Sequence, residues 1–149
     1  MPEQTNLRQN LDRLFDAELQ FKDAALVAAT AAAEVSSVAK IIDTGGGYFE
    51  GDMVLDMTAV EVASGDELYV IHVQGSTSAT FASAYKSIVC FECGDAAVLT
   101  GDADVGTGRY VLPFSNQIGE TIYRYLRVYT VVSGTIATGI NYEANAVQR

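Results

Sequence analysis

The spacing of hydrophobic side chains changes along the chain and separates an N-terminal segment from the rest. Within residues 1–20, apolar side chains recur at intervals of three or four positions: Leu7, Leu11, Leu14 and Phe15. This spacing predicts an amphipathic helix of about three turns. Because so short a helix is marginally stable in water, its apolar stripe must pack against another surface. Residues 21–34 are rich in alanine, which by local propensity favours a helix.

From Val35 onward, hydrophobic residues alternate with polar ones, which indicates β-strands. The expected strands end at residues typical of turns and cover Val38–Asp43, Met53–Val62, Glu67–Gln74, Ser87–Cys93, Arg109–Phe114, Ile122–Val132 and Ile136–Ala146. Only a short turn separates the second strand from the third, so we expect these two to form a hairpin. The pattern predicts an all-β antiparallel fold: a β-sandwich, jelly roll or barrel. We therefore expect an N-terminal arm over residues 1–34 and one β-domain over residues 35–149.

Length and charge narrow the classes of partner. The chain has 149 residues, enough for one domain with its own core, and a formal net charge of −10. An acidic chain repels phosphate, so nucleic acid and anionic membranes are not expected partners. From Asp43 to Asp104 the chain holds 11 acidic residues and a single basic one, Lys86. This distribution suits a protein that meets a partner with its ends and water with its middle, or equally a solubilising surface.

Cysteine usage and the N-terminus indicate where the chain folds. Two cysteines three positions apart do not form a disulfide framework. The N-terminus has no basic-then-apolar signal segment, and the apolar run from Ala24 to Ala33 is too short to span a membrane. We expect synthesis and folding in a reducing cytoplasm.

Metal and cofactor patterns are present only in fragments. Cys90 and Cys93 form a C-x-x-C, but His72 is the only histidine, and residues three apart on a strand point to opposite faces. Asp102-Ala103-Asp104 begins like a calcium loop, yet Gly106 and Pro113 fill later ligand positions. We expect two structural cysteines, a structural histidine, a solvated turn, and no bound metal or cofactor.

Asp43-Thr44-Gly45 is the sharpest local motif. With Ile41 and Ile42 before it, it resembles the active-site elbow of retroviral-type aspartic proteases, which pair two such aspartates across a homodimer. Gly46 and Gly47 depart from that pattern, and no convincing flap hairpin follows. The other interpretation is that Asp and Gly simply end a strand. The protease is kept as the alternative enzymatic function.

The segment from Ile122 to Tyr129 alternates cleanly. Ile122, Leu126 and Val128 take one face together with Arg124. The opposite face carries the side chains of Tyr123, Tyr125, Arg127 and Tyr129. Tyrosine and arginine suit a contact surface because both offer large area and hydrogen bonds. Tyrosines could equally line a sandwich core with their hydroxyls at its edge.

The order of segments resembles the jelly-roll capsid cement, or decoration, proteins of tailed bacteriophages. The matching segments are Phe15-Asp16-Ala17 through Leu19-Gln20-Phe21, Ile41-Ile42-Asp43-Thr44-Gly45, Ser64-Gly65, Arg109-Tyr110-Val111-Leu112-Pro113, Arg124-Tyr125-Leu126-Arg127-Val128-Tyr129, Val132-Ser133-Gly134-Thr135 and Gly139. The resemblance covers most of residues 15–146 and rests on the ordered set, not on one motif. Residues 1–14 and the acidic loops depart from it.

This resemblance implies a structural virion protein without enzymatic activity. Such a protein sits on the outer surface of the phage head and clamps adjacent subunits of the major capsid protein. It also implies that residues 16–34 are extended, so we favour an extended arm after a short helix. We expect self-association as a dimer or trimer. The residues expected to contact another copy or the shell are Leu7, Leu11, Leu14, Phe15, Tyr123, Tyr125, Arg127 and Tyr129. A generic β-sandwich binding module is a further alternative.

Overall fold

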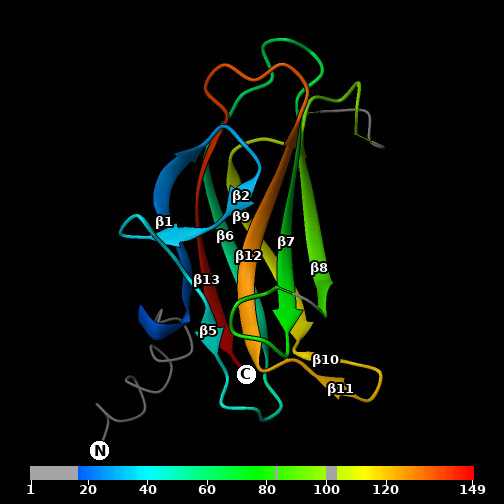
Figure 1. Ribbon diagram of the computed structural model, residues 1–149. Helices are drawn as coiled ribbons and strands as arrows, with labels where there is room; N and C mark the ends of the chain where they lie inside the picture. Colours follow the sequence, from blue (N-terminus) through cyan, green and yellow to red (C-terminus); the bar gives the residue numbers. More distant parts are fainter. Residues whose placement is uncertain (1–16, 83, 100–103) are drawn as a thin grey trace, which may run out of the picture.

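The computed structural model describes residues 17–82, 84–99 and 104–149, which form two antiparallel sheets lying face to face (Figure 1). Sheet A has the strand order β1-β13-β6-β9, with bounds Gln20–Val27, Ile140–Gln148, Glu50–Val60 and Gly108–Ser115. Sheet B has the order β2-β12-β7-β8, with bounds Ala31–Ala32, Tyr125–Ser133, Leu68–Ser76 and Tyr85–Gly94. The short strand β5 (Ile42–Asp43) also pairs with β12. The predicted all-β antiparallel sandwich is confirmed.

Short elements complete the chain. The 3-10 turn η1 covers Ala17–Leu19. Two small hairpins pair β3 (Glu34–Val35) with β4 (Val38–Ala39) and β10 (Gln117–Ile118) with β11 (Thr121–Ile122). The strand expected over Val38–Asp43 is therefore split, because β4 pairs back on β3 while β5 joins sheet B.

Alternating side chains of the two sheets fill the core between them. The fully buried residues include Met53, Leu55, Tyr142 and Ala144 from sheet A and Tyr69, Ile71, Leu126 and Val128 from sheet B. The hydroxyls of Tyr142 and Thr130 lie 2.6 Å apart and satisfy each other across the core. The two-residue period of the sequence is thus the period of burial.

The hairpin expected between the second and third strands is wrong. β6 pairs with β13 and β9, whereas β7 pairs with β12 and β8. The turn between β6 and β7 therefore carries the chain from sheet A to sheet B. Leu55 of β6 and Ile71 of β7 belong to one core but enter it from opposite sheets. Alternation could not separate the two arrangements, because both bury the same residues.

The segment after η1 is extended and belongs to the sandwich. β1 pairs with β13 at the edge of sheet A, and β2 pairs with β12 of sheet B. Phe21 is fully buried, with its ring centroid 6.3 Å from that of Phe114. Strand pairing and this burial outweigh the helix propensity of the alanines. The expected boundary between residues 34 and 35 therefore does not separate an arm from the core.

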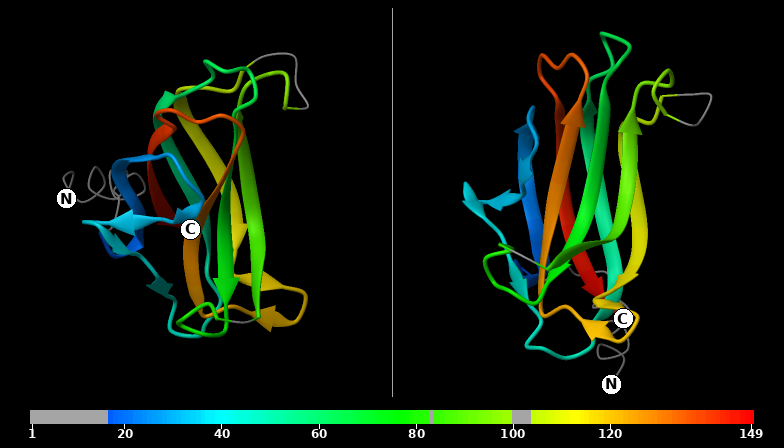
Figure 2. Two further views of the ribbon diagram at one scale, coloured as in Figure 1. Left: turned by 45° about the horizontal axis from the view of Figure 1, so that its top comes forward. Right: turned by 45° about the vertical axis from the view of Figure 1, so that its right-hand side comes forward.

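The two sides of the sandwich differ (Figure 2). On one side, residues 20–43 run from the edge of sheet A to the edge of sheet B. On the other side, β8 and β9 end their sheets, and the rings of Phe91 and Tyr110 meet between them with centroids 4.5 Å apart. β8 is bulged at Ile88, since its neighbours Ser87 and Val89 pair with consecutive residues of β7.

Candidate functional site

β12 sends alternate side chains to the two faces of sheet B, as its sequence pattern predicts. Leu126 and Val128 are fully buried in the core. On the outer face, Tyr125, Arg127 and Tyr129 lie across from Ser76, Gln74 and His72 of β7. We call the surface formed by these residues the outer face of sheet B. It holds three of the four interface residues predicted on this strand.

Tyr123, the fourth of these residues, is not on the outer face. It precedes β12 and is 7% exposed. Its backbone N–H donates to the Asn116 carbonyl (2.7 Å), and its own carbonyl accepts from the Asn116 side chain (3.1 Å). A Cβ on Gly75 would lie 2.7 Å from the Tyr123 Cβ, so glycine is required for this approach. Tyr123 therefore anchors the chain that leads into β12.

Arg127 is the centre of an aromatic cluster on the outer face. Its guanidinium carbon lies 4.3 Å from the ring centroid of Phe81, 4.9 Å from that of Tyr129 and 5.7 Å from that of Tyr85. Its Nε donates to the Gln74 side-chain oxygen at 2.9 Å. These five residues are the Arg127 cluster. Desolvation by burial lowers the pKa of Arg127 from its ordinary value, and the electrostatic effects of Tyr129 and Tyr85 oppose this shift.

The loop after β7 supplies Phe81 to this cluster. It crosses the lower part of β12 and β7 in Figure 1, and the Phe81 ring is buried there with 4% exposure. Phe81 and Ala84 both have positive φ, 53° and 54°, a conformation that is unfavourable for residues other than glycine. In the sequence, residues 75–84 consist of Gly, Ser, Thr and Ala around Phe81, and no periodicity marks Phe81 as a site residue. Phe81 is the single aromatic residue of that loop, which is the one sequence feature that could have indicated its role.

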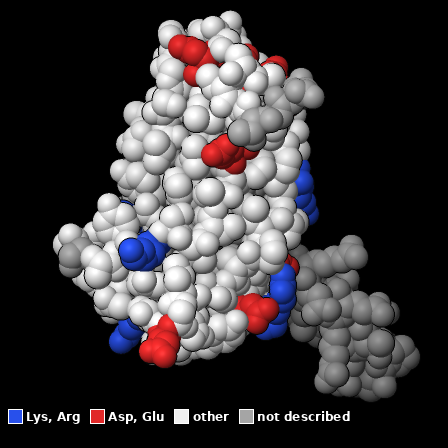
Figure 3. Space-filling view, turned by 90° about the vertical axis from the view of Figure 1, so that its right-hand side faces the viewer, with Lys and Arg blue, Asp and Glu red and all other residues white. Residues whose placement is uncertain are grey.

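Charged side chains are sparse on the side of the sandwich where β8 and β9 are the edge strands. Figure 3 views the molecule from the side of β8 and β9, and uncharged surface predominates between a few charged side chains. On the outer face of sheet B, Tyr85 is 48% and Val131 38% exposed. Around Arg127 this face combines exposed aromatic groups with one arginine, a composition typical of protein–protein interfaces; the exposed Glu92 lies farther along it, across from Val70.

Asp43 is held by Arg124 and not poised for proton sharing. Arg124 Nε and Nη2 donate to the two carboxylate oxygens at 2.8 and 3.1 Å, and the Gly45 N–H donates to Oδ1 at 2.8 Å. The Arg124 hydrogen bond, followed by that of Gly45, lowers the pKa of Asp43 below its ordinary value. An aspartic protease needs one carboxyl of its pair protonated. The geometry at Asp43 therefore gives the protease alternative no support.

The two cysteines lie on opposite faces of β8, as the strand parity predicts. Cys93 is fully buried and Cys90 is exposed. Burial raises the pKa of the Cys93 thiol to about 12, which keeps it protonated. His72 Nδ1 and the Ser87 hydroxyl lie 2.8 Å apart, and burial lowers the pKa of this histidine. Both observations agree with structural roles.

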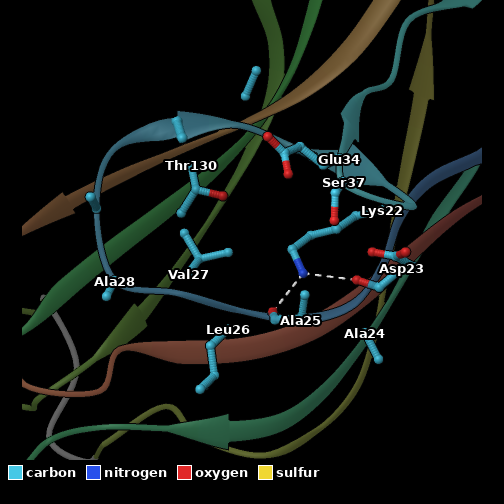
Figure 4. Close-up of a pocket in the computed structure, with 14 residues that line it drawn as sticks. Lys22, Asp23, Ala24, Ala25, Leu26, Val27, Ala28, Glu34, Ser37 and Thr130 are labelled. Atoms are coloured by element: carbon cyan, nitrogen blue, oxygen red, sulfur yellow. Dashed lines mark hydrogen bonds between the residues drawn. The ribbon is translucent and has the colours of Figure 1, made fainter.

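A pocket of about 480 Å³ lies between β1 and the β2–β3 segment (Figure 4). Half of its 14 lining residues are alanines, and Lys22 and Glu34 also line it. The Lys22 ammonium donates to the carbonyls of Asp23 (2.9 Å), Ala25 (2.7 Å) and Tyr142 (2.8 Å). Burial lowers the pKa of Lys22 to about 8. With all three of its donors in use, this amine ties the irregular part of β1 to β13 and is not available to a ligand.

Other expected features fall partly or wholly outside the described residues. The predicted interface residues of the N-terminal helix do so: Leu7, Leu11, Leu14 and Phe15. So do Asp102 and Ala103; Asp104 accepts a hydrogen bond from the Ala96 N–H at 2.8 Å. Within residues 17–82, 84–99 and 104–149, no three potential metal-ligating side chains gather, and no helix is long and apolar enough to cross a membrane.

No protein-family model matches the chain, and no curated protein matches its sequence. The outer face of sheet B is therefore the candidate functional site on geometric grounds alone.

Proposed function

We propose that this chain is a structural, non-enzymatic virion protein that decorates the outer surface of a bacteriophage head. In this role it binds the major capsid protein and bridges adjacent subunits, and it associates with further copies of itself. The ordered resemblance to jelly-roll cement proteins supports this proposal. The Arg127 cluster is the single structural observation that carries it.

The physical argument begins with the shape of the cluster. Attachment to a shell depends on contact area and a few strong anchors, not on convergent catalytic groups. β-strands hold Arg127, Tyr129 and Tyr85 in fixed positions on a two-layer scaffold. Such preorganised side chains lose little conformational entropy on binding. Arginine and tyrosine are also enriched among the residues that dominate binding energy.

Co-sedimentation tests the proposal directly. The purified protein would be mixed with empty capsid shells of the phage whose genome carries this chain, pelleted, and imaged by negative-stain electron microscopy. We expect saturable binding and a regular added density on the shell surface. Tyr125→Ala should weaken this binding, whereas Val111→Ala should not, because Val111 is an exposed residue of sheet A, 55% accessible.

Two outcomes would count against the proposal. If the protein is added in excess over the shell subunits and none of it sediments with the shells, shell binding is excluded. Peptide cleavage at acidic pH that disappears in Asp43→Asn would favour the protease instead.

A further inference from the structure

Arg127 differs from the other arginines of the described chain in having no carboxylate partner. Arg109 binds Asp56 with Nε and Nη2 at 2.6 and 3.0 Å, and Arg124 binds Asp43 in the same way at 2.8 and 3.1 Å. Arg149 reaches both Glu50 and Asp52, at 3.2 and 2.5 Å. For Arg127, within residues 17–82, 84–99 and 104–149, the only hydrogen bond found is the one from Nε to the neutral Gln74 side chain.

Two donor groups of the Arg127 guanidinium have no hydrogen-bond partner among residues 17–82, 84–99 and 104–149. Aromatic rings contact a guanidinium through its flat faces, whereas hydrogen bonds are donated in its plane. Gln74 takes Nε, so the edge that Arg109 and Arg124 present to their aspartates is already half used. The two Nη groups remain, and together they form the end-on fork that fits both oxygens of a carboxylate.

In the isolated chain, the surroundings of these two Nη groups are energetically unfavourable. Phe81 covers the guanidinium from a loop with two left-handed residues, and conformations of this kind persist where surrounding structure enforces them. The partial desolvation of Arg127 also strengthens any charge–charge contact it makes. The chain has 19 acidic residues, yet none of those that the structure describes forms an ion pair with Arg127.

We propose that the Arg127 cluster is a binding site for a carboxylate presented by a partner protein, which the two Nη groups hold end-on. The side chain of an Asp or Glu, or a chain terminus, supplies the carboxylate, and apolar atoms beside it pack on Tyr85 and Tyr129. Phosphate shares the oxyanion chemistry, but the chain's net charge of −10 disfavours polyphosphate partners. The identification of the partner as a capsid subunit rests on the proposed function; the carboxylate chemistry does not.

The first test needs no partner. In protein labelled with ¹⁵N-arginine, the side-chain resonances of Arg127 are assigned by their loss in Arg127→Lys. Sodium acetate should shift them saturably, several-fold more than those of Arg109, which is already paired. Sodium chloride at equal ionic strength should not. No saturable acetate shift, or saturation by phosphate but not acetate, overturns the assignment.

The second test separates this inference from the proposed function. Arg127→Lys keeps the charge but loses the planar fork, so it should weaken shell binding about tenfold, while Arg109→Lys should leave it unchanged. Binding to shells that is unaffected by Arg127→Lys would overturn the carboxylate site and leave decoration intact. Acetate binding without shell binding would leave the site intact and overturn decoration.

Discussion

The outer faces of the two sheets differ in how their arginine side chains are partnered. On sheet A, Asp56 and Arg109 pair across neighbouring strands, and Glu143 accepts from Gln20 and Asn145 at 3.3 and 3.2 Å. On sheet B, the cation of the Arg127 cluster lies among rings and one neutral amide. A face whose charges satisfy one another is suited to water. A face with an incompletely partnered cation is suited to a partner that completes it.

The largest expected effect concerns the scaffold that both faces share. Phe21→Ala should lower the free energy of unfolding by about 3–5 kcal/mol, because it removes a fully buried ring from the edge of sheet A. Urea denaturation measures this loss. Deleting residues 2–16 is the matched control and should leave the folded sandwich in place with weaker shell attachment. Equal unfolding by both changes would show that the leading segment, too, is essential to the fold.

The next effect should separate the two faces. Arg127→Ala should weaken shell binding or self-association by about tenfold or more, as expected for an interface anchor. Its free energy of unfolding should fall by only about 1 kcal/mol, the scale of a cation–aromatic contact. Sedimentation and thermal melting would be compared for Arg127→Ala and Arg109→Ala, and only the former should affect binding. If Arg127→Ala binds normally once folded, the comparison between the faces fails.

A smaller effect concerns the ion pair on sheet A. The Arg109 side chain is 60% exposed, so its attraction to Asp56 should be weak and screened by salt. A double-mutant cycle of Arg109→Ala and Asp56→Ala should give a small coupling that vanishes in high salt. A coupling that persists in high salt would contradict the view of sheet A as a water-facing surface.

The smallest effect on stability comes with acid. The pKa of Asp43 is lowered by its hydrogen bonds to Arg124 and Gly45, so this carboxylate stabilises the folded state above its ordinary pKa of 3.8, and the contribution is lost as the pH falls through the lower folded value. An Asp or Glu carboxyl of the partner protein, before it binds, has an ordinary pKa of about 4. Shell binding should therefore decline before the Asp43–Arg124 pair opens, which parallel sedimentation and NMR titrations would detect. The reverse order would contradict a carboxylate at Arg127.

The sequence pattern predicted what depends on local periodicity. Alternation identified the strands and correctly divided Leu126 and Val128 from Tyr125, Arg127 and Tyr129. It could not predict strand partners, because β6 and β7 bury the same residues whether they pair together or lie in opposite sheets. Strand pairing is decided by contacts distant in sequence, which no single segment records.

Two further differences have specific causes. Tyr123 continues the outward parity of its segment, yet β12 begins only at Tyr125 and close approach to Gly75 buries its ring. Phe81 joins the site from a loop, where no periodicity exists to predict its direction. The residues that β12 contributes to the candidate site could therefore be predicted from sequence, whereas the residue contributed by a loop through tertiary contacts could not.

Among the described residues, β8 and β9 are the edge strands on one side of the sandwich, and strand edges matter where copies of a protein are crowded together. Copies bound side by side on the proposed shell would face one another at very high local concentration, where unpaired strand edges tend to join neighbouring molecules into continuous sheets. Pro113 removes one backbone donor from β9, and the bulge at Ile88 bends β8 out of regular pairing geometry. If copies do bind side by side on a shell, these two irregularities would limit edge-to-edge pairing between them.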